Sequence, residues 1–380
     1  MDFTFTEEQL AAVEAAKAVF SGVAPDAVPS PALTAGAVAE DFDRPLWARL
    51  AASDLLSLVL DAEHGGAGLD PIALCLVLRE SARVLARLPL LETSAVALAV
   101  QRYGQAELGR ELLPAVGRGE LALTVAANGR TGHDGAELAV TAVRDGDHWV
   151  FDGAQTGVPW APTCDRIAVP AHTADGHTVL ALVPRAERGV TLAEQISTSG
   201  ERFAELRLEA VRVDAGAVIT ADGAWEWLRD LLATGTCALA LGLGEAVLAL
   251  TGHYTGKREQ FGHPVATFQA VAVQAADRYI DLRAMEATLW QAAWRISTGA
   301  DSALPVAGDV AVAKIWASEG VRRVVQTAQH LHGGFGADTD YALHRYHAWA
   351  KQLELSLGSA AAHEEALGEL LAAHPLGQPA

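Results

Sequence analysis

The periodicity of the apolar residues changes twice along this chain of 380 residues, and that change constrains the fold more than any other feature. Up to about Gly117, and again from Trp225 almost to the end, apolar residues recur at the spacing of helices that bury one face. Between Glu120 and Val213, short alternating segments are separated by Gly, Asp and Pro turns, which is typical of strands in a barrel or sandwich. The sequence therefore predicts an α+β fold that is mainly α. Its three domains are expected at residues 1–117 (helical), 118–217 (β) and 218–380 (helical bundle).

Charge and cysteine usage argue against several classes of protein. The chain has 28 Lys and Arg against 47 Asp and Glu, a formal net charge of −19, which repels phosphate backbones and anionic lipid. We therefore expect no nucleic-acid partner and no membrane-surface role. Three scattered cysteines predict neither a disulfide framework nor a metal site, as is typical of the reducing cytoplasm. The apolar stretch Ala233–Thr251 contains three glycines and a glutamate, so it predicts a buried helix rather than a membrane span.

One segment in the last third, Lys257–Gln269, joins two expected helices and contains both glycine and proline. One helix is expected to end near Arg258, and a new one to open near Pro264. An arginine beside the first turn of a helix can bind a pyrophosphate, because its fork of donors adds to unpaired amides and to the positive end of the helix dipole. Phe261 can supply a packing surface for a planar group, and Gln269 a polar clamp. The alternative interpretation is an ordinary turn between helices with a surface arginine.

A second glycine-rich segment, His330–Gly336, follows the long helical pattern of residues 306–329. Gly333 and Gly334 are expected to end that helix, and glycines so closely spaced let a ligand approach the backbone. The segment does not follow a strand, which rules out a dinucleotide-binding Rossmann fingerprint. By itself it is a weak signal, because glycine-rich helix ends are common.

Taken in order with the opening segment Phe3–Gln9 and the loop Glu63–Leu69, these two segments resemble the acyl-CoA dehydrogenase family along nearly the whole chain. The resemblance implies an N-terminal helical domain, a middle β-domain and a C-terminal four-helix bundle, usually assembled as a tetramer that binds FAD. Members desaturate an acyl-CoA between Cα and Cβ: a Glu removes the α-proton while the β-hydride goes to flavin N5. The positions that match the family's cofactor-binding residues are Arg258, Phe261, Phe268, Gln269, His330, Gly333 and Gly334. His330 stands where the family usually has Gln, and it can still donate to a phosphate or carbonyl oxygen.

The sequence departs from the family at the catalytic base. The commonest base is a Glu directly before a Gly-Thr/Ser pair, which here is Gly358-Ser359, and the preceding residue is Leu357. Other members carry the base on the first long helix of the C-terminal domain, at a position that falls on about Leu232. An alkyl side chain cannot accept a proton, so no catalytic residue is expected at either position. Glu354, one helical turn from Leu357, is the weak remaining candidate, and its alternative is a solvated helix residue.

The strand domain departs from the family where the flavin ring would lie. The family's Thr-Glu-Pro-x-Ala-Gly-Ser-Asp segment is replaced by residues 124–134. The positions of an aromatic residue and a Thr that the family offers to the isoalloxazine fall on Gly157 and Pro159, and a shifted register of Trp160 would restore a ring. We therefore expect that this chain lacks the residues that hold the flavin ring.

The family divides its FAD site between two subunits, and this chain is expected to supply only one half. In the family, one subunit's β-domain holds the flavin ring, while the two loops of a neighbouring subunit hold the pyrophosphate and adenosine. The chain is thus similar to the partner subunits of heterotetrameric acyl-CoA dehydrogenases of actinobacteria, many of which act on CoA thioesters of steroid side chains. We expect a cytoplasmic α2β2 complex whose homologous catalytic subunit brings the Glu, shares FAD with this chain, oxidises an acyl-CoA and reduces an electron-transfer acceptor. Two alternatives stay open: a homotetramer that uses Glu354, and a flavin-free scaffold subunit.

Overall fold

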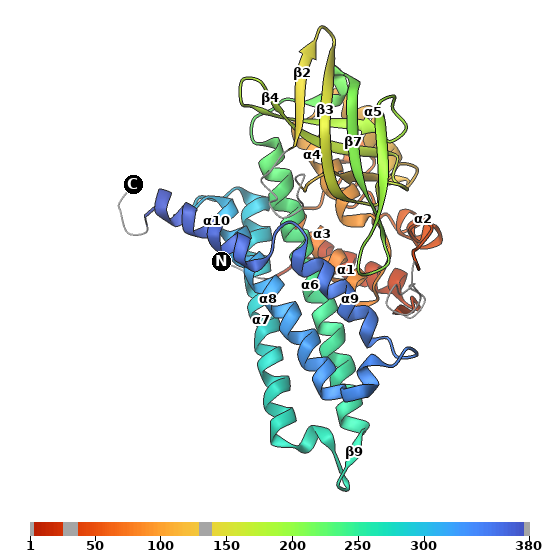
Figure 1. Ribbon diagram of the computed structural model, residues 1–380, viewed down its shortest axis with the longest axis vertical. Coiled ribbons are helices and arrows are strands. Elements are labelled where there is room, and N and C mark those ends of the chain that lie inside the picture. Colours follow the sequence, from red (N-terminus) through yellow and green to blue (C-terminus); the bar gives the residue numbers. More distant parts are fainter. Residues whose placement is uncertain (1–3, 26–36, 129–138, 376–380) are drawn as a thin grey trace.

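The computed structural model describes residues 4–25, 37–128 and 139–375, and it has three parts. In Figure 1 the strands gather at one end of the molecule, the first helices pack beside them, and the long helices extend away to the other end. One apolar core runs through both helical parts, and a second fills the strand-rich part. This order of helices, strands and helices confirms the expected α+β, mainly α fold.

The N-terminal helices begin at residues that cap them. Thr6 and Gln9 form a reciprocal capping box, in which each side chain accepts from the other residue's backbone N–H. Asp70 caps the third helix, which has Pro71 at its first position, where the missing N–H costs nothing. The helices are α1 (Glu7–Phe20), α2 (Arg44–Ala52), α3 (Pro71–Arg83), α4 (Leu90–Tyr103) and α5 (Ala106–Gly117), with a 3-10 turn, η2, at Ala62–His64.

The strands form one sheet in the order β6-β7-β3-β2-β4-β5-β8, and β1 pairs in parallel with β4. Burial alternates along β2 and over most of β7, which is the pattern of strands with one face on a core. Phe151, Ile167 and Val211 are fully buried in that core. The strands are β1 (Leu123–Val125), β2 (Val140–Asp145), β3 (His148–Pro159), β4 (Arg166–Thr173), β5 (Thr178–Pro184), β6 (Val190–Ile196), β7 (Arg202–Asp214) and β8 (Val218–Ile219), with a 3-10 turn, η3, at Ala215–Ala217.

The C-terminal part is built on one long apolar helix, α6 (Ala224–Lys257). This helix is apolar enough to cross a membrane by composition alone, but 78% of its most apolar stretch is buried inside the protein, so it is a core helix. The hairpin β9 (Glu259–Gln260) and β10 (His263–Pro264) and the 3-10 turn η4 (Val265–Thr267) follow it. The remaining elements are α7 (Gln269–Thr298), α8 (Val306–His332), the 3-10 segment η5 (Gly333–Ala337), α9 (Leu343–Leu355) and α10 (Ala360–Ala373).

Helices α3 and α6 approach each other closely at a glycine. A Cβ atom added at Gly242 would lie 1.9 Å from the carbonyl oxygen of Arg79, so only glycine fits there. One helical turn away, the Arg79 guanidinium binds the Glu245 carboxylate, with Nε 2.8 Å from Oε2. This contact fixes the N-terminal helices against the bundle and so determines the space between them.

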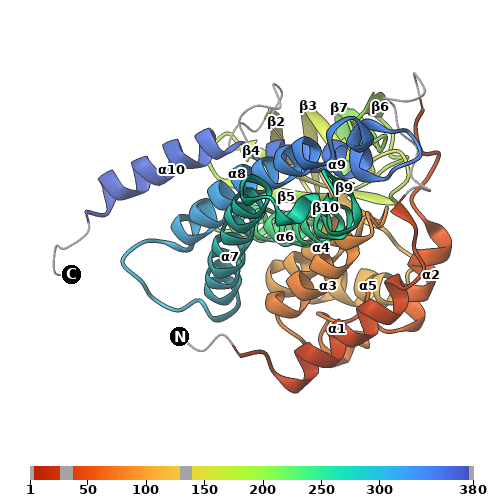
Figure 2. The same cartoon turned by 90° about the horizontal axis from the view of Figure 1, so that it is seen from below.

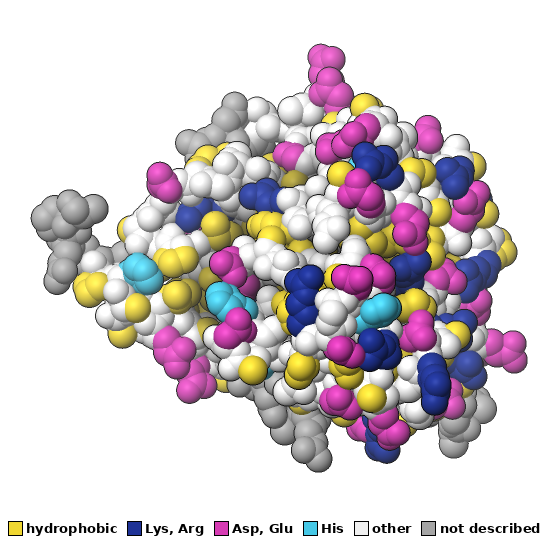
Figure 3. All heavy atoms as spheres, turned by 90° about the horizontal axis from the view of Figure 1, so that it is seen from above, with side chains coloured by type: hydrophobic (Ala, Val, Ile, Leu, Met, Phe, Trp, Pro, Cys, Tyr) yellow, Lys and Arg dark blue, Asp and Glu magenta, His cyan; other side chains and the backbone are white. Residues whose placement is uncertain are grey.

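The visible face of the described residues carries charges of both signs (Figure 3). Figure 3 shows that Lys and Arg side chains lie among Asp and Glu side chains on the visible face and do not gather into one patch. Helix α10 projects away from the rest of the bundle in Figures 1 and 2, and Ala360 at its start is its buried residue.

Candidate functional site

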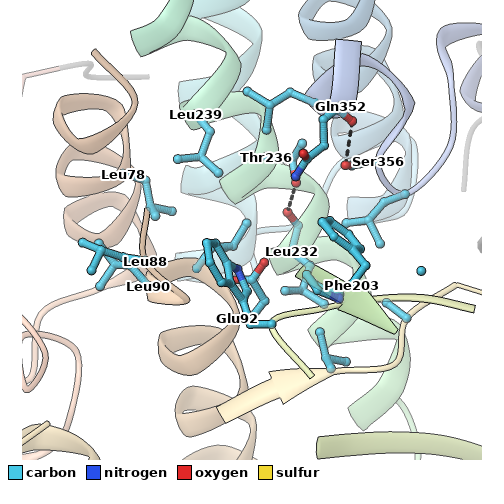
Figure 4. Close-up of a pocket in the computed structure, with 18 of the residues that line it drawn as sticks. Leu78, Leu88, Leu90, Glu92, Phe203, Leu232, Thr236, Leu239, Gln352 and Ser356 are labelled. Carbon is cyan, nitrogen blue, oxygen red and sulfur yellow. Dashed lines mark hydrogen bonds between the residues drawn. The ribbon is translucent and has the colours of Figure 1, made fainter. Parts of the chain in front are cut away.

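A cavity lies where the first helices, the strands and the bundle meet (Figure 4). The space in it that the centre of a water-sized sphere can reach is about 100 Å³. Side chains reach it from α3, α4, β1, β3, β7, α6 and α9, so no single stretch of sequence defines it. Most of the lining is apolar, as in Leu78, Leu91, Val125, Phe203, Leu239 and Leu353.

Both positions at which the resemblance places the base, Leu232 and Leu357, line this cavity. Leu232 comes from α6 and Leu357 from the turn after α9. The φ of Leu357 is 56°, in the left-handed region, which costs about 1–2 kcal/mol for a residue with a side chain. The backbone therefore holds a strained conformation at a position whose side chain cannot accept a proton.

Two buried side chains hold the turn that carries Leu357. Lys314 on α8 donates from Nζ to the carbonyl oxygens of Gly358 (3.0 Å) and Glu354 (3.3 Å). Burial lowers the pKa of Lys314 to about 8. His363 on α10 donates from Nε2 to the Leu357 carbonyl at 2.9 Å, and burial lowers the pKa of His363 to about 4. The turn is fixed from two sides.

The strand wall of the cavity is formed by Gly157, Pro159 and Trp160. The φ of Gly157 is 60°, and a Cβ there would lie 3.1 Å from Nδ2 of Asn128, which itself donates to the Gly157 carbonyl at 3.3 Å. Trp160 supplies an indole ring to the wall, although the two positions that match the family's ring-binding residues are Gly157 and Pro159. Of the replaced segment 124–134, residues 129–134 lie outside the described residues.

The hydroxyl groups in the cavity lining donate to the protein's own backbone. Figure 4 shows two of these bonds, from Thr236 to the Leu232 carbonyl (2.9 Å) and from Ser356 to the Gln352 carbonyl (2.7 Å). Ser81 does the same on α3, at 2.7 Å from the carbonyl of Leu78. An isoalloxazine needs donors along its carbonyl and N5 edge, and these groups are already used. These three hydroxyls of the described lining therefore do not supply the donors that the ring half of FAD needs.

Glu92 is a carboxyl group in the cavity wall that no pattern in the sequence singles out. It lies in the first turn of α4, and Figure 4 shows it at the inner end beside Leu88 and Leu90. Burial raises the pKa of Glu92 to about 7, against the lowering effects of its own backbone N–H and of the Trp160 side chain. In the sequence it looks like an ordinary acid that complements a helix dipole, so only its three-dimensional surroundings distinguish it.

Glu354, the remaining candidate base, does not line this cavity. Its carboxylate pairs with Lys351, with Nζ and Oε2 2.6 Å apart. The structure therefore places Glu354 outside the cavity lining, in an ion pair and with 15% of its side chain exposed.

The segment after α6 forms a two-residue hairpin turn with an exposed aromatic side chain at its tip. Phe261 and Gly262 have φ values of 54° and 78°, which are those of a type I′ turn. Asn or Gly usually takes the first of these positions, because a side chain there is strained. Phe261 is also 91% exposed. A strained and largely solvent-exposed Phe is costly in the isolated chain, and such strain is often found at functional residues.

Beside this turn lie the exposed Arg258 and the start of α7. Among the described residues no ion pair to Arg258 is found. The sequence predicted a helix opening near Pro264, but α7 begins at Gln269, because Pro264 is extended in β10 and η4 follows it. No side chain caps α7, so its first amides and its positive dipole end are free to bind an anion. Phe268 contacts Phe261 edge to face, with ring centroids 6.4 Å apart.

The glycine-rich loop lies at the same end of the bundle and is linked to α6 by stacked rings. Tyr254, one turn before Arg258, stacks on His332 (4.4 Å between centroids) and on Phe335 (5.3 Å). His332 donates from Nδ1 to the Ala328 carbonyl (2.7 Å), and burial lowers the pKa of His332. The stack lies beside His330, which is exposed in the last turn of α8, and beside Gly333 and Gly334, which are exposed in η5.

The cavity and the hairpin are far apart along α6. Leu232 lines the cavity and Arg258 follows the last residue of the helix. At 1.5 Å per residue, they are separated by about 39 Å. Figure 1 shows the hairpin, labelled β9, at the end of the molecule opposite the strands. One small cofactor in this chain's own cavity cannot reach this chain's own hairpin.

Known proteins match the chain in both sequence and structure. The profile of the acyl-CoA dehydrogenase N-terminal domain matches residues 6–120, and that of the C-terminal domain matches residues 225–371. Acyl-CoA dehydrogenase FadE27 of Mycobacterium tuberculosis is 35% identical over 339 residues, which cover 88% of this chain and 90% of that protein.

Two solved complexes are similar over nearly the full length. A variant of the Tcur3481–Tcur3483 steroid ACAD has a TM-score of 0.88 at 38% identity, covering 97% of this chain and 98% of that one. The ChsE4–ChsE5 complex from Mycobacterium tuberculosis also has a TM-score of 0.88, at 34% identity, and covers 100% of both chains.

Proposed function

The chain belongs to the acyl-CoA dehydrogenase family, and from this premise we propose that it is the non-catalytic subunit of a heteromeric, FAD-dependent member. One observation carries the proposal: the hairpin that suits a nucleotide lies about 39 Å along α6 from a cavity whose two base positions are both leucine. The hairpin therefore serves a flavin seated mainly in another polypeptide, which also supplies the base. The proposed domains are residues 1–117, 118–217 and 218–380, of which the last contributes to FAD.

The residues of the hairpin end match the nucleotide half of FAD in charge and shape. The Arg258 guanidinium and the first amides of α7 would hold the pyrophosphate. Phe261 would cover a flat face of the cofactor, with Phe268 behind it and Gln269 as a polar clamp. The glycine-rich loop with His330, Gly333 and Gly334 would let adenosine approach the backbone. When bound, FAD supplies the hydride acceptor for α,β-desaturation of an acyl-CoA.

The substrate and assembly follow from the relatives. The similarity to a steroid ACAD, together with the similarity to two complexes named for two proteins each, supports a CoA thioester of a steroid side chain and an α2β2 assembly. The electrons would pass to an electron-transfer acceptor, in the cytoplasm.

The test is the flavin content of the complex. The full chain is co-expressed with a homologous catalytic dehydrogenase subunit, and we expect about one FAD per heterodimer. Arg258→Ala should remove most of that FAD, whereas Arg188→Ala, at an exposed arginine of the strand-rich part, should leave it unchanged. Equal flavin content in both variants would overturn the proposal.

Purifying the chain without a partner distinguishes this proposal from a self-sufficient homotetramer. We expect it to purify folded, colourless and inactive. A yellow, active protein would instead favour the homotetramer, whose base would have to be Glu354 or the cavity residue Glu92. A complex that forms without flavin would indicate a scaffold subunit.

A further inference from the structure

The first half of α9 contains several buried polar atoms that have no hydrogen-bond partner. Among the described residues, twelve buried side-chain nitrogen and oxygen atoms lack such a partner, and four of the twelve lie in residues 344–349. They belong to His344 (Nε2), Arg345 (Nε and Nη1) and Trp349 (Nε1). Folded proteins rarely leave buried polar atoms unpaired, because each such atom costs free energy. Their concentration within six residues therefore calls for a specific explanation.

Arg345 is the charged member of this group. Among the described residues, no hydrogen bond or ion pair to its guanidinium is found. Its Nε and Nη1 atoms are buried, and the side chain as a whole is partly buried. Nη2 has no partner either and is not one of the buried atoms, so it is the end of the guanidinium that reaches the surface. The charge has thus lost part of its hydration without gaining an acceptor, which is unfavourable.

Other arginines show how this protein usually compensates such a charge. Three of them in the described part of the chain also have a buried Nε without a well-directed hydrogen bond, but each pairs with a carboxylate. These ion pairs are Arg202–Glu194 (3.2 Å), Arg278–Asp281 (2.8 Å) and Arg295–Asp309 (2.7 Å). Arginines without an ion pair, such as Arg49 and Arg188, are exposed to water. Arg345 has neither a carboxylate nor full hydration.

Arg345 lies beside the part of the molecule that the proposed function assigns to the partner subunit. Tyr341, four residues earlier, contacts Phe335 and His332 in the ring stack, with centroids 4.5 Å and 5.3 Å apart. Phe335 is 43% exposed, next to the glycines of η5. The ring stack and the start of α9 therefore form one continuous region. A protein that covers the glycine-rich segment can also reach Arg345.

A carboxylate on a docked protein suits Arg345 better than a free anion does. Arg345 does not line the cavity described above, so the walls of that cavity do not shield its open end from water. At 4 Å, two unit charges attract about four times more strongly at the effective dielectric constant of a protein surface than in bulk water. A docked protein would cover the open end of the guanidinium and displace that water.

We infer that Arg345 is an interface residue that binds a Glu or Asp carboxylate of the catalytic partner subunit. The inference rests on the proposed function, because it assigns the missing acceptor to that subunit. The pair forms only on assembly, so the cost of the unpaired charge is present in the free chain and relieved in the complex. Removing the charge should therefore have opposite effects on the free chain and on the complex.

The first measurement uses the full chain purified alone. Arg345→Met keeps much of the length of the side chain and removes its charge, so this variant should unfold at a temperature about 2–4 °C higher. Arg49→Met, at an exposed position of α2, should leave the midpoint of unfolding unchanged. An unchanged or lower midpoint for Arg345→Met, or a failure to fold, would mean that the guanidinium is already compensated within the chain. That result would overturn the inference.

The second measurement uses the complex with the co-expressed catalytic subunit. The purified complex is diluted in steps, and mass photometry gives the fraction that stays assembled. Arg345→Met should weaken assembly about tenfold or more, because the carboxylate of the partner is then left unpaired. Arg345→Lys keeps the charge without the fork of donors and should lie between the two. Equal assembly of Arg345→Met and Arg49→Met would overturn the inference and leave the shared flavin site standing.

Flavin content distinguishes this inference from the proposed function. The Arg345→Met complex that still assembles should hold about one FAD per heterodimer, whereas Arg258→Ala should lose FAD. If Arg345→Met loses FAD while assembly is unchanged, its acceptor is a phosphate of the cofactor, and the inference is overturned while the shared site stands. If the unmodified chain forms no complex, the proposed function fails and this inference fails with it.

Discussion

The two ends of α6 differ in the kind of residues that lie around them. At the strand end, Leu232 lines an apolar cavity in which the hydroxyl groups of Ser81, Thr236 and Ser356 donate to backbone carbonyls. At the other end, Phe261 is exposed in a strained turn beside an arginine and an uncapped helix. The first end has a cavity in which both expected base positions are leucine, and the second has groups that can bind an anion but, among the described residues, no enclosing cavity. This division is the one that the proposed shared flavin site requires.

The largest effect is expected where the cavity end depends on close packing. Gly242→Ala should reduce the free energy of unfolding by about 3 kcal/mol or more, because its Cβ would lie 1.9 Å from the Arg79 carbonyl oxygen. Gly252→Ala lies in the same helix with nothing within 4 Å, and should stabilise the chain by about 0.5–1 kcal/mol. Thermal unfolding of both variants measures these changes in the free energy of unfolding. Equal shifts would mean that the α3–α6 contact does not hold the cavity open.

A smaller effect is expected from the carboxyl in the cavity. Burial raises the pKa of Glu92 to about 7 from 4.5, so the folded chain holds a proton that the unfolded chain releases between these values. Because the folded state binds more protons in this window, this group makes the free energy of unfolding fall as pH rises from about 4.5 to 7. Glu92→Gln removes that dependence, and at pH 8 it should be more stable than the unmodified chain by about 1–3 kcal/mol.

Urea unfolding at pH 5 and pH 8 checks this prediction, with Glu364→Gln on the exposed surface of α10 as the control. An unchanged pH dependence in Glu92→Gln would show that the carboxyl is solvated, which would weaken the contrast between the two ends.

The smallest effect on stability is expected at the hairpin tip. There, a substitution that stabilises the hairpin should reduce the amount of FAD that the complex retains. Asn tolerates the left-handed conformation of Phe261, so Phe261→Asn should stabilise the hairpin by about 1 kcal/mol. The same change removes the exposed ring, and the complex should retain less FAD. Amide exchange at Gln260 and His263 and flavin content measure the two effects. A stabilised hairpin with full flavin content would show that the ring serves no cofactor.

The sequence could predict the fold class and family, and both are confirmed. The changes of periodicity at Glu120 and Trp225 are local signals, and the motif around Arg258 is contiguous. The start of α7 was misplaced, because the pairing of β9 with β10 keeps Pro264 extended.

The cavity could not be predicted, because seven elements from distant parts of the chain line it. Glu92 and Trp349 both line the cavity. In the sequence, Glu92 looks like an ordinary acid in the first turn of a helix, and Trp349 looks like an ordinary ring on the apolar face of another helix. Their surroundings become visible only when α4 and α9 are placed against α6. From the sequence one could infer that Leu357 and Leu232 cannot act as bases. That both residues line the same cavity could not be inferred from it.

The continuity of α6 has an evolutionary consequence. One unbroken helix joins the cavity to the hairpin. Inserting or deleting a single residue between them would therefore move Arg258 relative to the cavity by about 1.5 Å along the helix axis and by about 100° around it. A loop can adjust its conformation to an inserted or deleted residue, whereas a continuous helix passes the whole shift and rotation on to its far end. Under the proposed shared flavin site, the length of α6 has to match the dimensions of the partner subunit, and the two genes are expected to tolerate length changes there only in concert.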